Sequence, residues 1–179
     1  MHRHLLSLLA LLTVACAHSG NAPWYVPTGS TVTINQPITI PSESASVKIQ
    51  SGKPMSFQDI NQYAPYCVLE VHKRMDTPQE VKPGQFTVTK NVQRDYYTSV
   101  APQIVASVGS SSSGPIHYIN DIYLTSPERD DVFRLSCQQY SDPWQFAPGQ
   151  RWATVNQMQI ALGQLITLSA ATKSPGTGR

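Results

Sequence analysis

The sequence has few charged residues. Asp, Glu, Lys and Arg make up 13% of its 179 residues, and the formal net charge at pH 7 is +2. It contains no run of Lys and Arg that could follow a phosphate backbone. Because nucleic-acid-binding proteins carry clustered positive charge, the composition predicts no nucleic-acid partner.

The familiar catalytic motifs are also missing. The sequence has no G-x-S-x-G elbow, no H-E-x-x-H zinc motif, no P-loop and no G-x-G-x-x-G turn. We therefore predict that the protein is not an enzyme and has no cofactor. A hydrolase that uses an unfamiliar site around His72 or His117 is the alternative.

Long apolar runs are absent except at the N-terminus. Residues 5–14 form an apolar run that follows the basic segment Met1–His4. Such a run is typical of a secretory signal peptide, and it is shorter than the roughly twenty residues that a membrane-spanning helix needs. We predict that residues 1–15 are a signal peptide and that the mature protein is exported.

The segment Leu12–Cys16, with the sequence Leu-Thr-Val-Ala-Cys, resembles the lipobox of bacterial lipoproteins. The resemblance implies that Cys16 is acylated and anchors the protein in the membrane. Ala17, in place of Asp, resembles the family's signal for the outer membrane, with the domain facing the periplasm. Ala15-Cys16-Ala17 is also an A-x-A site for ordinary signal peptidase, which would release a soluble periplasmic or secreted protein that starts at His18.

Cysteine is scarce, with three residues in the chain. Apart from Cys16, these are Cys67 in Tyr-Cys-Val-Leu-Glu-Val and Cys137 in Val-Phe-Arg-Leu-Ser-Cys. Both stretches alternate with the two-residue period of a half-buried strand, and each cysteine is in phase with the apolar residues. We predict a disulfide between Cys67 and Cys137 that joins two strands in an oxidising compartment. Two buried free thiols, or a redox-active pair, are the alternatives.

The mature chain is a little over 160 residues long, enough for a single domain. Short alternating stretches bounded by Pro and Gly fill most of residues 31–168, and Thr154 and Gln157 form a capping-box pattern before the apolar stripe of one helix. We predict a mainly β domain, an antiparallel β-sandwich or small barrel with one C-terminal helix. Residues 16–30 are expected to be the lipidated cysteine and a tether, and residues 169–179 a disordered tail.

Four aromatic residues near the end of this domain are candidates for binding: Tyr140, Trp144, Phe146 and Trp152. They could form an exposed platform for a glycan or a partner protein. Alternatively, they pack over the open end of the sheet and against the helix.

Two groups of ionisable residues could supply metal ligands, but neither has the spacing of a known metal motif. His72 and His117 could meet across a sheet, with Glu70 or Asp121 as a third ligand. Residues 128–131 (Glu-Arg-Asp-Asp) could supply oxygens for calcium, although an arginine interrupts them. We predict surface roles for these residues and no metal site.

Taken as a whole, the mature domain has a Pro-Tyr-Cys strand, a later Leu-Ser-Cys strand and a terminal Leu-Gly helix. This layout resembles uncharacterised proteobacterial lipoproteins, which implies no function. The sequence favours a non-enzymatic envelope lipoprotein that acts as a scaffold or accessory subunit and binds an envelope protein partner. The alternative is a periplasmic module that binds a glycan or small ligand through its aromatic loop.

Overall fold

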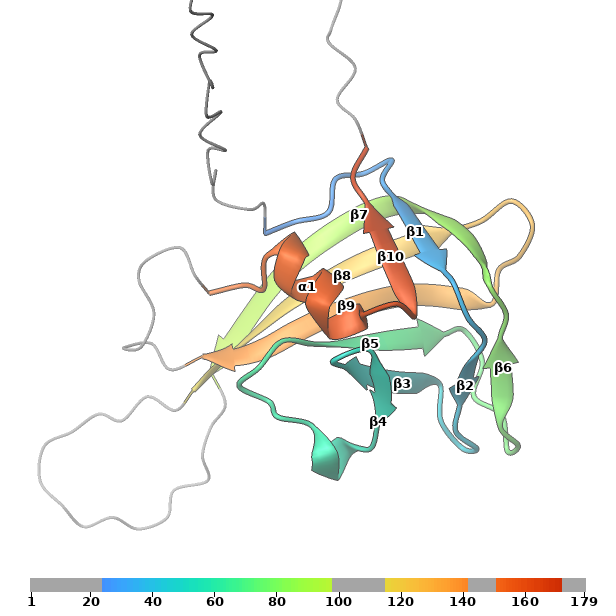
Figure 1. Ribbon diagram of the computed structural model, residues 1–179, viewed down its shortest axis with the longest axis horizontal. Coiled ribbons are helices and arrows are strands. Elements are labelled where there is room, and N and C mark those ends of the chain that lie inside the picture. The colour runs from blue at the N-terminus through green and yellow to red at the C-terminus, as the bar shows by residue number, and fades with distance from the viewer. Residues whose placement is uncertain (1–23, 98–114, 142–150, 172–179) are drawn as a thin grey trace, which may run out of the picture.

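The computed structural model of the protein describes residues 24–97, 115–141 and 151–171 (Figure 1). The elements in chain order are β1 (Thr31–Ile34), β2 (Ile38–Ile40), β3 (Ser46–Gln50), β4 (Lys53–Met55), a short 3-10 helix (Phe57–Asp59), β5 (Tyr66–Val71), β6 (Gln79–Val81), β7 (Gly84–Tyr97), β8 (Ile116–Thr125), β9 (Val132–Ser141), α1 (Val155–Leu162) and β10 (Ile166–Ser169).

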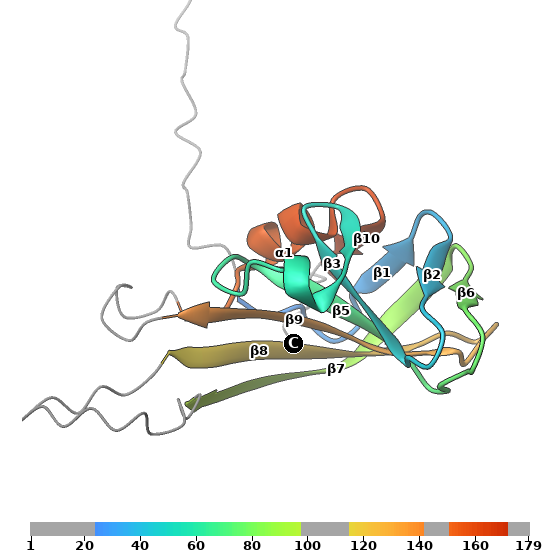
Figure 2. The ribbon, with the colours of Figure 1, turned by 90° about the horizontal axis from the view of Figure 1, so that it is seen from below.

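Eight of the strands form one antiparallel sheet, in the order β10-β1-β7-β8-β9-β5-β3-β4. The sheet curls into a half-barrel, and α1 lies against its inner side (Figures 1 and 2). A separate pair, β2 and β6, extends one end of the molecule. The predicted fold class, a mainly β antiparallel domain with a single helix near the C-terminus, is confirmed.

The inner face of the sheet, which points toward α1, carries the hydrophobic core. Strand residues of alternating phase are buried there, as the two-residue period requires, and three helix residues complete the core from the other side. The fully buried members with the largest side chains include Phe86, Ile34, Ile49, Leu69, Ile122, Leu135, Met158 and Leu162. We call the opposite side of β5, β7, β8 and β9 the outer face.

The predicted disulfide is confirmed. Cys67 on β5 and Cys137 on β9 lie directly opposite each other in the ladder, with 4.0 Å between their Cα atoms. Both side chains are buried in the core, as their phase in the two strands predicted. The bond therefore joins neighbouring strands at the centre of the sheet, in a position that favours a structural role over a redox role.

Helix α1 begins at the predicted capping box. The Thr154 hydroxyl accepts a hydrogen bond from the Gln157 amide (3.2 Å), and the Gln157 side-chain oxygen accepts one from the Thr154 amide (2.8 Å). The helix ends at Gly163, whose φ of +58° is accessible to glycine at low cost. The chain then turns back into β10, a strand that the sequence did not single out because the apolar helical stripe continues to Leu165.

The packed part of the chain extends beyond the expected limits of 31–168 at both ends. Val26 is buried in the core, so the segment before β1 is not simply a tether. At the other end, Ser169 belongs to β10, and the Ala171 amide donates to the Ser30 hydroxyl (3.0 Å). Apolar burial and pairing with β1 fix these two segments to the domain.

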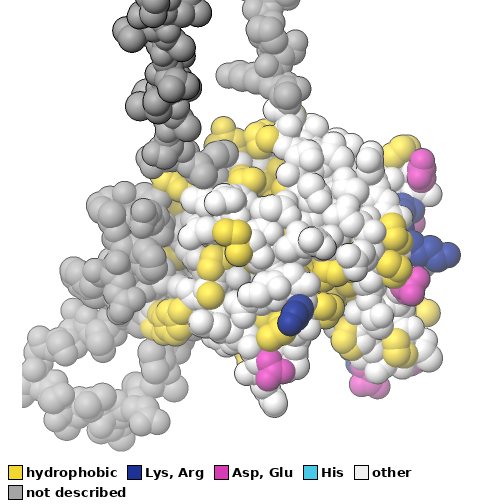
Figure 3. Space-filling model, in the orientation of Figure 1, with side chains coloured by type: hydrophobic (Ala, Val, Ile, Leu, Met, Phe, Trp, Pro, Cys, Tyr) yellow, Lys and Arg dark blue, Asp and Glu magenta, His cyan; other side chains and the backbone are white. Residues whose placement is uncertain are grey.

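Charged side chains are sparse over the middle of the face that carries α1, and they gather toward the β2-β6 pair (Figure 3). None of the helices in the described ranges has the length and apolar character needed to cross a bilayer.

Candidate functional site

Both ends of the eight-stranded sheet are protected against pairing with another chain. At β10 the Gln159 side chain takes the place of a neighbouring strand: its oxygen accepts from the Leu168 amide (2.8 Å), and its nitrogen donates to the Ile166 carbonyl (2.9 Å). At the other end, β4 is three residues long and has Pro54 at its centre, which has no amide hydrogen to donate. Short edge strands, proline and side-chain caps are typical devices against edge-to-edge association.

The long strand β7 has an open edge. Strand β1 pairs with β7 only from Gly84 to Thr87, and two further main-chain bonds join Val88 to the chain just before β1. Beyond Val88, β7 continues to Tyr97 with β8 on one side and no strand on the other among the described residues. This is the longest stretch of unpaired edge in the described part of the sheet.

The ladder pattern determines which groups of β7 face outward. In an antiparallel ladder, directly opposite residues whose Cα atoms are about 4.5 Å apart form a pair without main-chain hydrogen bonds between them. Cys67 and Cys137, with Cα atoms 4.0 Å apart, are such a non-hydrogen-bonded pair. The main-chain groups of Cys137 therefore point toward β8, and the alternation carries across to β7. It leaves the N–H and C=O groups of the odd-numbered residues from Asn91 to Tyr97 pointing away from β8.

The first half of this edge has a neighbour on its inner side. The Gln93 side chain donates to the Trp24 carbonyl (3.1 Å), and the Asn91 side chain donates to the Val26 carbonyl (3.4 Å). These contacts use side chains, so no described main-chain group occupies the edge itself. Toward the end of β7, Tyr96 and Tyr97 are 47% and 64% exposed on opposite faces.

A network of charges on the outer face holds β7 against its neighbours. Asp121 on β8 is 1% exposed and lies between two arginines, accepting from Arg94 Nε of β7 (2.7 Å) and pairing with Arg134 Nη1 of β9 (3.4 Å). Arg134 Nε also lies 3.0 Å from a carboxylate oxygen of Glu70 on β5. The network links four strands across the outer face and fixes the strand that carries the open edge.

Beside this network, aromatic rings cross the outer face in one row. His117 lies between Tyr96 and Tyr140, with its Nδ1 2.6 Å from the Tyr96 hydroxyl and its ring stacked on Tyr140. Burial lowers the pKa of His117, and the charge of Arg94 acts in the same direction, while a hydrogen bond to the Gln138 side chain opposes them. The row therefore favours a neutral imidazole.

The four predicted aromatic candidates are separated by the structure. Tyr140 lies in the row on the outer face, where its ring covers that of His117. Trp152 packs edge-on against Tyr118, with 5.1 Å between centroids, and donates to the Arg94 carbonyl (3.3 Å), a packing role rather than an exposed platform. Trp144 and Phe146 lie outside the described residues, as does Cys16. The aromatic-loop hypothesis therefore stays a prediction.

The structure does not bring the two candidate histidines together. His72 lies beside Phe133 near the start of β9, whereas His117 lies opposite Tyr140 near its end. Seven residues of extended strand separate these positions, or about 23 Å. Within residues 24–97, 115–141 and 151–171, no three His, Cys, Asp or Glu side chains are close enough to share a metal ion.

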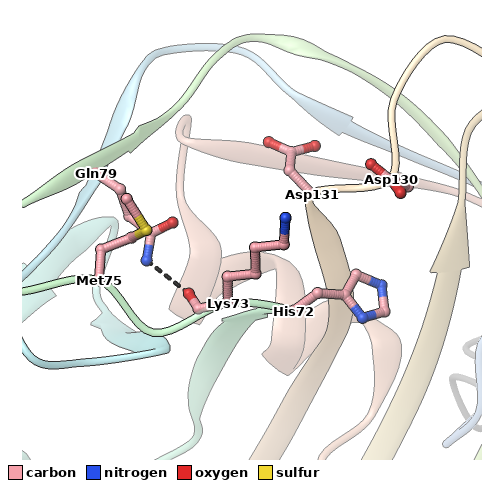
Figure 4. Close-up of a pocket in the computed structure, with 6 residues that line it drawn as sticks. All are labelled: His72, Lys73, Met75, Gln79, Asp130 and Asp131. Carbon is pink, nitrogen blue, oxygen red and sulfur yellow. Dashed lines mark hydrogen bonds between the residues drawn. The ribbon is translucent and has the colours of Figure 1, made fainter.

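His72 lines a cavity of about 550 Å³ at this end of the sheet, together with Lys73, Met75, Gln79, Asp130 and Asp131 (Figure 4). The lining residues come from the connection between β5 and β6, from the first residue of β6, and from the turn between β8 and β9. The ionisable groups in the lining are one imidazole, one ammonium and two carboxylates. The sequence had indicated only a solvated strand end and a charged turn here.

Asp131, one of the residues that could have supplied oxygens for calcium, is already paired in this cavity. Arg129 forms an ion pair with its carboxylate and donates hydrogen bonds to it. These hydrogen bonds hold the pKa of Asp131 below its ordinary value, although burial acts in the opposite direction. A calcium ion would have to displace the guanidinium of Arg129.

Comparison with known proteins does not assign the chain to a family. No protein-family model, curated protein or solved structure matches it. A functional proposal therefore depends on the residues of this chain.

Proposed function

We propose that the protein is a non-enzymatic envelope lipoprotein, anchored in the outer membrane through acylated Cys16, that serves as an accessory subunit by pairing the open edge of β7 with a strand of an envelope protein partner. The observation that supports this function is the row of outward main-chain N–H and C=O groups of the odd-numbered residues from Asn91 to Tyr97, which have no main-chain partner among the described residues. An added strand satisfies such groups and gains affinity from their hydrogen bonds.

The rest of the sheet directs pairing to this edge. Gln159 occupies the edge of β10, and Pro54 interrupts β4, so the two ends of the sheet are poor acceptors for a strand. Tyr96 and Tyr97 provide exposed aromatic area beside the free edge, and tyrosine is among the residues that contribute most to protein interfaces.

The experiment uses the full chain, produced in its native host, with a photo-crosslinking benzoylphenylalanine in place of Tyr97. We expect a crosslink to one envelope protein. The same substitution at Thr39, an exposed residue of β2, serves as the position control. An equal crosslink from Thr39 to the same protein would contradict docking at β7.

A matched pair of variants separates main-chain pairing from ordinary surface contact. Asp95→Pro removes an outward N–H and adds a ring to the free edge, while it leaves the bonds to β8 in place. Asp95→Ala removes the same side chain and keeps the N–H. We expect the crosslink from Tyr97 to disappear with proline and to persist with alanine; equal yields from both variants would rule out strand addition.

A further inference from the structure

The cavity lined by His72, near the start of β9, is bounded by segments that hydrogen bonds hold in place. The Gln79 side chain donates to the Lys73 carbonyl (2.8 Å), which fixes the path of the connection after β5. The Met75 carbonyl accepts from the Glu43 amide (2.7 Å), and the His72 amide donates to the Asp131 carbonyl (3.1 Å). The connection is thus tied both to the segment before β3 and to the turn that forms the opposite wall.

Two opposite charges face this cavity without neutralising each other. Lys73 extends its ammonium toward the segment that carries Asp130 and Asp131 (Figure 4). Among the described residues, neither Lys73 nor Asp130 forms an ion pair, whereas Asp131 is paired with Arg129. The cavity therefore offers one free cation and one free carboxylate on different walls.

The remaining lining is suited to an apolar group. Met75 contributes a flexible thioether side chain that is 45% exposed, and the ring of His72 also lines the cavity. The volume, about 550 Å³, is within the range of small-molecule sites, roughly 300–1,000 Å³.

We propose that this cavity binds a small zwitterion, an α-amino acid with an apolar side chain. The ligand carboxylate pairs with Lys73, its ammonium pairs with Asp130, and its side chain contacts Met75. Each charged group of the ligand then meets an opposite charge that has no other described partner. The binding is independent of the open edge of β7, which lies near the far end of β9.

Isothermal titration calorimetry of the full mature chain with L- and D-methionine tests this site. At least one enantiomer is expected to bind. N-acetylmethionine, which lacks the ammonium, and methionine amide, which lacks the carboxylate, are each expected to bind about tenfold more weakly or worse. The proposal is overturned if neither enantiomer binds, or if either derivative binds as well as the free amino acid.

Two variants test whether Lys73 and Asp130 are the charged partners of the ligand. Lys73→Met and Asp130→Asn are each expected to weaken methionine binding about tenfold without changing the unfolding midpoint, because both side chains are exposed. Lys53→Met and Glu80→Gln remove exposed charges elsewhere and serve as controls that keep full affinity. Unchanged affinity in Lys73→Met or Asp130→Asn would overturn the assignment, as would binding of divalent cations in place of methionine.

Asp95→Pro should leave methionine affinity unchanged, and Lys73→Met should leave the Tyr97 crosslink unchanged. Failure of one proposal is therefore distinguishable from failure of the other.

Discussion

The imidazole ring of His117 lies parallel to the phenol ring of Tyr140, with 4.2 Å between centroids and 4° between planes. The two residues are direct neighbours across β8 and β9. The stack buries the imidazole, and the hydroxyl of Tyr96 contacts its Nδ1 on the other side. Protonation of this ring would place a charge in a desolvated position close to Arg94.

Stability is therefore expected to fall on acidification from about pH 7 to pH 5. The unfolded histidine titrates near pH 6.5, and burial lowers the folded pKa of His117, so protons bind more tightly to the unfolded chain. The stability that the neutral His117 contributes is fully present above the pKa of the unfolded chain. It is lost as the pH falls through the pKa of the folded chain. Urea unfolding at the two pH values measures this loss.

His117→Phe keeps a stacked ring but cannot titrate, so this variant should lose less stability between the two pH values than the wild type. His72→Phe, at an exposed position, is the matched control and should retain the full pH dependence. If the His117→Phe variant lost as much stability as the wild type between the two pH values, the pH dependence would come from a group other than His117.

The Cys67–Cys137 disulfide is expected to contribute about 4 kcal/mol to the free energy of unfolding, because it closes a loop of about 70 residues in the unfolded chain. Replacing both cysteines with alanine should lower the urea midpoint, as should a reductant at partly denaturing urea. Cys16→Ala leaves this loop closed and should not change the midpoint. Equal midpoints for the double variant and the wild type would show that the bond contributes little.

Gln159→Ala should both destabilise the domain and open an edge. Each lost hydrogen bond of the Gln159 side chain is worth about 1 kcal/mol, and the Leu168 amide loses its described partner. With the edge of β10 free, self-association is also expected at high protein concentration. Urea unfolding and light scattering measure the two effects. Gln164→Ala, at an exposed position in the following turn, should show neither.

Gly163→Ala is expected to destabilise the domain by about 1–3 kcal/mol. A Cβ atom at Gly163 would lie 2.5 Å from the Cα of Gly52, and the φ of Gly163 is +58°. The end of α1 could then no longer approach the turn between β3 and β4. Gly84→Ala, where a Cβ would meet only ordinary contacts with Arg129, is the control and should have a small effect in thermal unfolding.

The sequence by itself determined the features that have local causes. Alternation with a period of two placed Cys67 and Cys137 on the buried side of two strands, and a pair of cysteines that face the same core predicted the bond. The capping box at Thr154 and Gln157 marked the start of the helix, because it needs only residues three apart. The mainly β fold class followed from many such short patterns.

Only the tertiary structure decided the features that depend on distant segments. The open edge of β7 exists because β1 pairs with only its first four residues, and no local pattern encodes the length of a partner strand. Gln159 resembles any other helical glutamine until β10 folds back beside it. Lys73 and Asp130 are 57 positions apart in the printed numbering, and they face one cavity because β5 and β9 pair. Pairing between strands far apart in sequence is set by global packing, which local periodicity does not specify.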